Sequence, residues 1–123
     1  MRGVGTDIVE IARIARSLRR RPAFAAAVFS ADERRFCDAQ ASPDQHYAAR
    51  FAAKEAFLKA VGRGVLDGVA LDEIEVTRSP ERAPALRLGP TAAAALASSG
   101  GREALVSLSH DGGMALAFVV VWG

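Results

Sequence analysis

The 123-residue chain is predicted to fold as α+β, with helices packed on a mainly antiparallel sheet. Helical spacing of apolar residues dominates the first half, whereas two strand-like apolar runs joined by a glycine-rich turn end the chain. Half of the residues are hydrophobic and 24% are charged, which allows a packed core and excludes wholesale disorder. We therefore expect one domain that spans residues 1–123.

Spacing and breaker residues predict the elements of the first half. Apolar residues recur at helical intervals from Ile8 onwards, so Asp7 is expected where a first strand passes into a helix that Pro22 ends. Ser30 and Glu33 have the spacing of a capping box, which predicts the start of a further helix. In order, we expect a strand over residues 2–5, a helix from residue 8 to 21, a short helix over 23–28 and a helix from about residue 31 to 41.

Residues 43–61 are predicted to form the longest helix. One side of it is a large apolar arc and the opposite side consists of alanines, so the helix is expected to be enclosed on several sides. Gly62 and Gly64 are expected to end it. Its charged side chains therefore need partners or a cleft. They are Arg50, Lys54, Glu55 and Lys59.

The second half of the chain alternates short strand patterns with one alanine-rich helix. A turn is expected over residues 79–84, between two short strands, and a second turn over His110–Gly113, after a longer strand. The predicted elements are strands around 74–76 and 86–88, a helix over 91–98 introduced by Pro90, and strands over 104–109 and 114–122.

Composition excludes several classes of protein. With Cys37 as the only cysteine, the chain forms no intramolecular disulfide and no cysteine-rich metal cluster. The first ten residues lack the apolar run of a signal peptide, and the longest apolar run, 114–122, is too short to span a bilayer as a helix. A net charge of +2 does not mark a nucleic-acid binder. We expect a soluble, cytoplasmic protein with no nucleic-acid or membrane partner.

Each candidate for chemistry has an ordinary structural reading beside it. Asp7 is either a helix N-cap or a ligand of a hard cation such as Mg²⁺. Glu55 and Lys59 are either an ordinary surface ion pair, or Glu55 is the second carboxylate ligand of that cation and Lys59 lies beside it. Gly3-Val4-Gly5 lacks the third glycine of a dinucleotide fingerprint, and His46 is expected at the surface. Five arginines form a solvated face or a docking patch for an acidic partner. They are Arg13, Arg16, Arg19, Arg20 and Arg21.

These signals occur together in one order along the chain. The motifs are GVGTDIVEIARI at 3–14, RFAAKEAFLKA at 50–60, Gly62 with Gly64, and SLSH at 107–110. This combination resembles the bacterial holo-[acyl carrier protein] synthases, the short group of the 4′-phosphopantetheinyl transferase superfamily, over essentially the whole chain. The resemblance implies that family's fold with one long central helix, and a homotrimer with active sites at subunit interfaces.

The resemblance also implies a reaction and roles for residues. The reaction is Mg²⁺-dependent transfer of 4′-phosphopantetheine from coenzyme A to a serine of an apo acyl carrier protein, which leaves adenosine 3′,5′-bisphosphate. Asp7 and Glu55 match the family's metal ligands, and Lys59 matches its active-site lysine. The coenzyme A contacts match Arg50, Lys59, Gly62 and His110. Arg13, expected further along the helix and away from the metal, matches the carrier-protein contact, with Arg20 or Arg21 a looser match.

The chemistry agrees with this assignment. Two carboxylates suit Mg²⁺ beside a pyrophosphate, and Glu55 or a metal-bound water is a fitting acceptor for the serine proton. Lys59 can give a proton to the departing oxygen, which an arginine practically cannot. Two alternatives stay open: a metal-dependent nucleotide phosphohydrolase, which would not use the arginines, and a non-catalytic module that binds an acidic protein, which would not use Asp7, Glu55 and Lys59.

Overall fold

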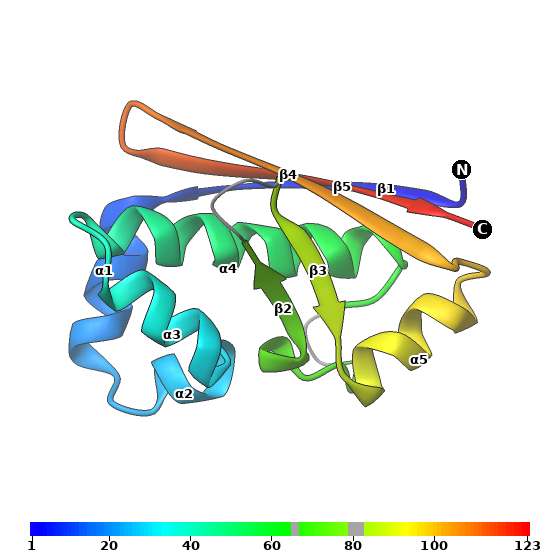
Figure 1. The fold of residues 1–123 in the computed structure, drawn as a ribbon, viewed down its shortest axis with the longest axis horizontal. Coiled ribbons are helices and arrows are strands. Elements are labelled where there is room, and N and C mark those ends of the chain that lie inside the picture. The colour runs from blue at the N-terminus through cyan, green and yellow to red at the C-terminus, as the bar shows by residue number, and fades with distance from the viewer. Residues whose placement is uncertain (65–66, 79–82) are drawn as a thin grey trace.

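The computed structural model describes residues 1–64, 67–78 and 83–123. Figure 1 shows a long helix lying along one face of a three-stranded sheet, with the other helices and a two-stranded sheet on the far side of that helix. The elements are β1 (Gly3–Glu10), α1 (Ile11–Arg20), α2 (Phe24–Val28), α3 (Ala31–Asp38), α4 (Pro43–Ala60), the 3₁₀ helix η1 (Leu71–Glu73), β2 (Ile74–Thr77), β3 (Ala85–Leu88), α5 (Pro90–Ser98), β4 (Glu103–Asp111) and β5 (Met114–Trp122).

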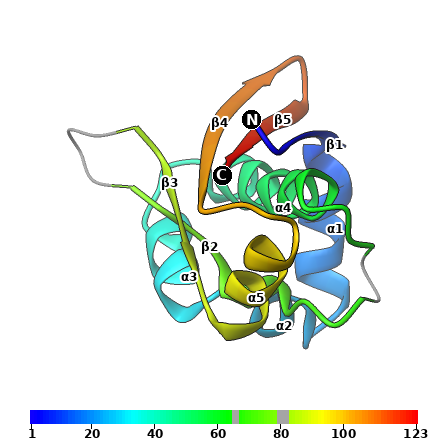
Figure 2. The same ribbon diagram turned by 90° about the vertical axis from the view of Figure 1, so that its right-hand side faces the viewer.

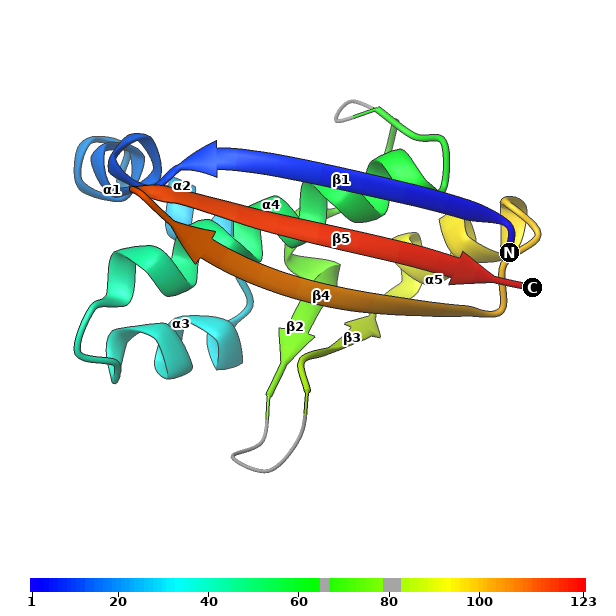
Figure 3. The same ribbon diagram turned by 90° about the horizontal axis from the view of Figure 1, so that it is seen from above.

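The larger sheet has the strand order β1-β5-β4, and both of its pairings are antiparallel. Figure 3 shows β5 between β1 and β4, although β1 begins the chain. The smaller sheet pairs β2 with β3, also antiparallel. The predicted α+β class is therefore confirmed, while residues 79–82 of the predicted turn lie outside the described residues.

Two predicted boundaries are wrong. The helix expected from Ile8 begins only at Ile11, because β1 pairs with β5 along its whole length and Ile8 stays 60% exposed on the sheet. Asp7 is thus a strand residue and not an N-cap. At the other end, His110 and the residue after it belong to β4, and the turn contracts to Gly112 and Gly113. Both glycines have positive φ, 57° and 80°, as a two-residue hairpin turn requires.

The close packing of β1 on α4 explains the Gly3-Val4-Gly5 motif. A Cβ added at Gly3 would lie 2.0 Å from the carbonyl oxygen of Ala60, and one at Gly5 would lie 2.0 Å from that of Ala56. Only glycine allows the strand backbone to approach the helix backbone this closely. Because side chains alternate along a strand, Asp7 lies on the same α4-facing side as the two glycines.

Helix α4 is enclosed as predicted, since eleven of its eighteen residues are buried. Figure 2 shows it between the three-stranded sheet and the layer that contains α2 and α3. Its alanines permit the contact with β1, and its larger apolar side chains fill the core on the other sides. No helix in the described residues combines the length and apolar character that crossing a membrane requires.

Lys54 is fully buried in α4, and its contacts indicate a structural role. Its Nζ donates to Glu33 Oε1 at 2.7 Å and to the carbonyl oxygens of Leu71 and Ile74 at 3.0 and 2.6 Å, so all three of its protons have acceptors. Glu33 also completes the predicted capping box with Ser30 and accepts from the backbone N–H of Val76 at 2.9 Å. This buried pair joins α3, α4 and β2.

Candidate active site

Asp7 and Lys59 meet where β1 crosses α4. Lys59 Nζ donates to Asp7 Oδ1 at 3.2 Å and to the carbonyl oxygen of Thr6 at 2.9 Å. The Asp7 side chain is only 19% exposed, whereas that of Lys59 is 57% exposed. The strand therefore fixes the carboxylate, and the longer ammonium reaches it from the helix while remaining open to a ligand.

Glu55 belongs to the same cluster. Its burial raises the pKa of the carboxyl above the ordinary value, and the negative charge of Asp7 raises this pKa further. The positive charges of Lys59 and Arg13 lower it. The structure thus brings the two carboxylates and Lys59 together as the sequence motifs predict. Arg13 is thus within electrostatic range of this cluster.

The donor set of this cluster fits a divalent cation. Carboxylate oxygens are hard ligands of the kind that Mg²⁺ takes, and a cation would offset both the burial and the negative charge of Asp7, which raise the pKa of Glu55. Within the described parts of the chain, no group of three or more histidine, cysteine or acidic residues could hold a metal. A cation held by Asp7 and Glu55 must therefore take further ligands from water or from a phosphate-bearing substrate.

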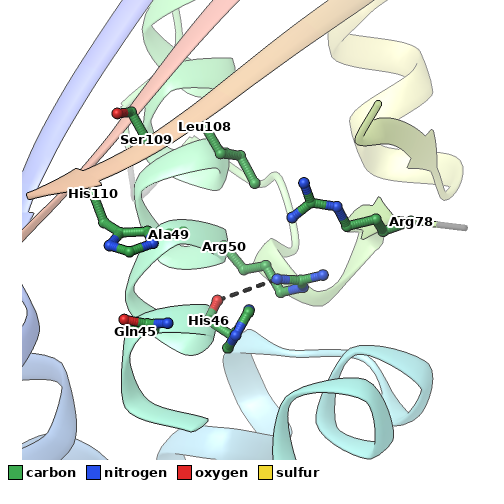
Figure 4. A pocket seen from close by; sticks show the side chains of 8 residues that line it. All are labelled: Gln45, His46, Ala49, Arg50, Arg78, Leu108, Ser109 and His110. Atoms are coloured by element: carbon green, nitrogen blue, oxygen red, sulfur yellow. Dashed lines mark hydrogen bonds between the residues drawn. The ribbon is translucent and has the colours of Figure 1, made fainter. Parts of the chain in front are cut away.

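A second polar cluster surrounds a cavity of about 320 Å³ between α4 and β4. Figure 4 shows Arg50 between His110 and Arg78, with His46 beside it. Arg50 is 1% exposed, and its guanidinium lies 4.4 Å from the Phe36 ring centroid. Its Nη1 donates to the His46 carbonyl oxygen at 3.4 Å, while its Nε has no hydrogen-bond partner among the described residues. These groups suit an anion.

His46, expected at the surface, is instead partly buried and lines this cavity. Its ring packs edge-on against Phe36 with centroids 5.7 Å apart. Burial lowers the pKa of His46 below its ordinary value, and the positive charges of Arg50, Arg78 and His110 lower it further. Sequence reasoning missed His46 and Arg78, because neither lies in a recognised motif; the spacing of His46 four residues before Arg50 was the available signal.

The two clusters lie on opposite flanks of α4 within one chain. Arg50 and Glu55 are five residues apart, which places them about 140° apart around the helix. Asp7 is in β1 and His110 in β4, and β5 separates these strands by about 10 Å in total. The structure therefore does not bring Arg50 and His110 together with Asp7, Glu55 and Lys59 in a single chain.

The remaining predicted site residues lie near the carboxylate cluster or at the end of α4. Gly62 follows α4 with φ 73°, in the left-handed region that favours glycine. Arg20 is exposed at the end of α1, and the Arg21 guanidinium lies 5.3 Å from the Phe24 ring centroid. Arg21 and Phe24 border a largely apolar pocket of about 450 Å³. Glu55 and Phe51 also line this pocket, which the sequence analysis did not foresee.

This α+β arrangement, with a strand carboxylate and a helix carboxylate in one polar cluster, is that of a phosphopantetheine-transferring enzyme. Residues 3–120 match the model of the 4′-phosphopantetheinyl transferase superfamily, and the chain belongs to that family.

Individual proteins similar to this chain agree with the family match. The chain is 43% identical over 122 residues to the holo-[acyl-carrier-protein] synthase of Syntrophotalea carbinolica, a match that covers 98% of this chain and 95% of the relative. Its fold matches the crystal structure of the Neisseria meningitidis holo-[acyl-carrier-protein] synthase with a TM-score of 0.88 and 34% identity, over 100% and 99% of the two chains. The Helicobacter pylori synthase in complex with coenzyme A matches with a TM-score of 0.82 and 32% identity, over 96% and 98%. These matches place the chain among the holo-[acyl-carrier-protein] synthases, as its motifs predict.

Proposed function

We propose that this enzyme transfers 4′-phosphopantetheine from coenzyme A to a serine of an apo acyl carrier protein, in a Mg²⁺-dependent reaction that releases adenosine 3′,5′-bisphosphate. The observation that carries the proposal is the meeting of Asp7, Glu55 and Lys59 where β1 crosses α4. The names of the relatives support the carrier protein as acceptor, and the Helicobacter pylori complex supports coenzyme A as donor.

Each residue of the carboxylate cluster has a role in this proposal. Asp7 and Glu55 hold Mg²⁺, which when bound supplies positive charge next to the pyrophosphate of coenzyme A. Glu55 is also placed to accept the proton of the attacking serine. Lys59, partly exposed beside Asp7, stabilises the departing phosphate oxygen of adenosine 3′,5′-bisphosphate by donating a proton to it.

A composite site between copies of the chain reconciles the two separated clusters. The pyrophosphate and the 3′-phosphate of coenzyme A are attached to one ribose. One coenzyme A molecule therefore cannot contact both flanks of α4 in the same subunit, because the helix lies between them. If a neighbouring copy supplies Arg50 and His110, while Gly62 and Lys59 come from the first, all the proposed contacts face one ligand. The site is then completed only by association.

The outer face of the larger sheet supports a homotrimer as this assembly. Large apolar side chains on it are between 41% and 60% exposed, and such a continuous patch on a small domain is typical of an interface. The patch comprises Val4, Ile8, Leu105, Leu116, Phe118 and Trp122. A second copy is the fitting occupant, because the same association would also complete the divided active site.

The docking surface for the carrier protein is proposed to include Arg13 with Arg20 or Arg21. These side chains are exposed, and the apolar pocket bordered by Phe24 and Phe51 opens beside Glu55. A basic rim around an apolar pocket next to the base suits an acidic protein that presents a serine.

The expectations of one domain over residues 1–123 and of a cytoplasmic location stay predictions.

The direct test is to incubate the protein with coenzyme A, Mg²⁺ and an apo carrier protein. A mass increase of the carrier by one phosphopantetheine group, lost in EDTA and in the variant Glu55→Gln, is the expected result. Release of adenosine 3′,5′-bisphosphate without a carrier would favour the nucleotide phosphohydrolase alternative. Binding of the carrier with no mass change would favour the non-catalytic module.

A further inference from the structure

The ion pair of Lys54 and Glu33 lies inside the core, one residue before the proposed metal ligand Glu55. Both side chains are 0% exposed, so neither contacts a substrate. A buried ion pair contributes little net stability, because the desolvation of two charges offsets much of their attraction. Its hydrogen bonds, however, are directional, so the pair can fix the elements around it in one arrangement.

Lys54 holds the short 3₁₀ helix η1 against α4. Its Nζ donates to the carbonyl oxygens of Leu71 at 3.0 Å and Ile74 at 2.6 Å, which are the first residue of η1 and the residue directly after it. One ammonium therefore holds both ends of this turn. The turn cannot slide along α4 without losing these hydrogen bonds. Leu71 also lines the apolar pocket beside Glu55.

Glu33 connects the end of α2 to Lys54. Its Oε1 accepts from Lys54 Nζ at 2.7 Å and from the backbone N–H of Ser30 at 3.0 Å, and its Oε2 accepts from that of Val76 at 2.9 Å. Ser30 lies two residues after α2, so the carboxylate holds the chain where it leaves that helix. Phe29, just before Ser30, is fully buried with its ring centroid 5.5 Å from Lys54 Nζ. The pair therefore connects α2, α4 and η1.

The same three elements provide walls of the apolar pocket of about 450 Å³ beside Glu55. Phe24 comes from α2, Phe51 from α4 and Leu71 from η1. The ring centroids of Phe24 and Phe51 are 6.2 Å apart, and Phe24 packs edge-on against Phe29 with centroids 6.1 Å apart. A shift of η1 or of the end of α2 would therefore change the shape of the pocket.

We propose that Lys54 and Glu33 are positioning residues, which hold the walls of this pocket in the arrangement that binds the carrier protein beside Glu55. The inference rests on the proposed function, in which the carrier docks at this pocket. The pair acts through Leu71 and Phe24 and touches no substrate itself. Without the pair, the walls adopt several arrangements, of which one binds. A pocket that is formed about one tenth of the time raises the apparent dissociation constant about tenfold.

A charge-neutral double variant tests the pair. Lys54→Met keeps an apolar stem but donates no hydrogen bond, and Glu33→Gln removes the carboxylate charge that would otherwise be buried alone. Thermal melting followed by circular dichroism establishes that the variant folds. Fluorescence anisotropy of a labelled apo acyl carrier protein gives its dissociation constant, and steady-state kinetics gives the KM for coenzyme A. We expect the carrier to bind about tenfold more weakly and the KM for coenzyme A to change less than about twofold.

Two single variants separate positioning from stability. Leu96→Ala truncates a buried residue of α5 that is not among the described residues lining the pocket. It should lower the melting temperature and leave the dissociation constant of the carrier unchanged. Leu71→Ala removes one wall while the pair stays intact, and Leu71 is only partly buried, so this variant should fold. It should weaken carrier binding severalfold without changing the KM for coenzyme A.

The outcomes distinguish this inference from the proposed function. Unchanged carrier binding in the folded double variant, equal weakening for both substrates, or equal weakening in Leu96→Ala would overturn the positioning role. If the double variant does not fold, Leu71→Ala decides: weaker carrier binding alone supports the role, and unchanged binding overturns it. A wild-type protein that neither binds nor modifies the carrier would overturn the proposed function as well.

Discussion

Two inactive variants of this chain should restore each other's activity when they assemble together. Glu55→Gln removes a proposed metal ligand from one flank of α4, and Arg50→Met removes a proposed phosphate contact from the other. In a composite site, one subunit supplies the carboxylates and its neighbour supplies the guanidinium. A mixed assembly therefore contains a site in which both contributions are wild-type.

The size of the recovery follows from the symmetry. A cyclic trimer has three equivalent interfaces, and each proposed site takes one half from each of two adjacent subunits. Any trimer that contains both variants, in either ratio, has one interface at which an Arg50→Met subunit supplies its intact carboxylates to an intact Arg50. Mixed trimers should thus show about one third of the wild-type activity per trimer.

The assay uses co-expression with two different affinity tags and purification over both, so that only mixed assemblies remain. Activity is the mass increase of an apo carrier protein, and light scattering gives the mass of the assembly. Asp7→Asn mixed with Glu55→Gln is the matched control, because both changes are on the same flank and no interface regains a complete site. Each variant alone must melt near the wild-type temperature. No activity in the first mixture, or equal recovery in the control, would refute the composite site.

Three further changes test other parts of the structure. Lys59→Arg should recover little of the turnover that Lys59→Ala loses, since arginine keeps the charge but holds its proton; steady-state kinetics with equal turnover for Lys59→Arg and wild type would contradict the acid role. Gly5→Ala should lower the free energy of unfolding by about 3 kcal/mol in urea, because its Cβ would meet the Ala56 carbonyl; an unchanged midpoint would contradict that packing. Arg20→Glu should raise the KM for the carrier severalfold and leave that for coenzyme A unchanged, whereas Arg102→Glu, at another exposed arginine, should change neither; equal effects on both substrates would argue against a docking role.

Most elements were predictable because their signals are local. The capping box of Ser30 and Glu33 marks the start of α3, and Pro90 marks the start of α5, so spacing and breaker residues suffice there. The enclosure of α4 also followed from its sequence, since apolar and alanine sides leave no charged face.

One of the two boundaries that failed depends on a partner distant in sequence. Ile8 and Ile11 have helical spacing, but the backbone around Ile8 pairs with β5, more than a hundred residues later. Local periodicity contains no information on such a pairing, so tertiary hydrogen bonding overrides it. The other boundary is local: His110 stays in its strand because it pairs with Ala115 across the hairpin, which leaves a turn shorter than the glycine-rich sequence predicts.

The sequence motifs predict a set of candidate site residues but not how these residues are arranged. The motifs identify Asp7, Glu55 and Lys59, and the structure brings these three together. They also identify Arg50 and His110, but their separation across α4 depends on the angle between two helix positions and on the strand order. Gly3 and Gly5 had no assigned role until the structure showed how closely β1 and α4 approach.

The position of β1 at the edge of the sheet has a consequence for how the enzyme is made. The strand that carries Asp7 is synthesised about a hundred residues before β5, yet β5 is its hydrogen-bonded neighbour in the described part of the sheet. A chain still emerging from the ribosome lacks β5, so β1 has no strand to pair with while the helices between them fold. Contacts of such large sequence separation form slowly, because the whole intervening chain has to be closed into a loop. The proposed metal ligands therefore gain their full support only when β5 has paired with β1, and a chain cut short before Met114 would lack the strand that holds Asp7 in register.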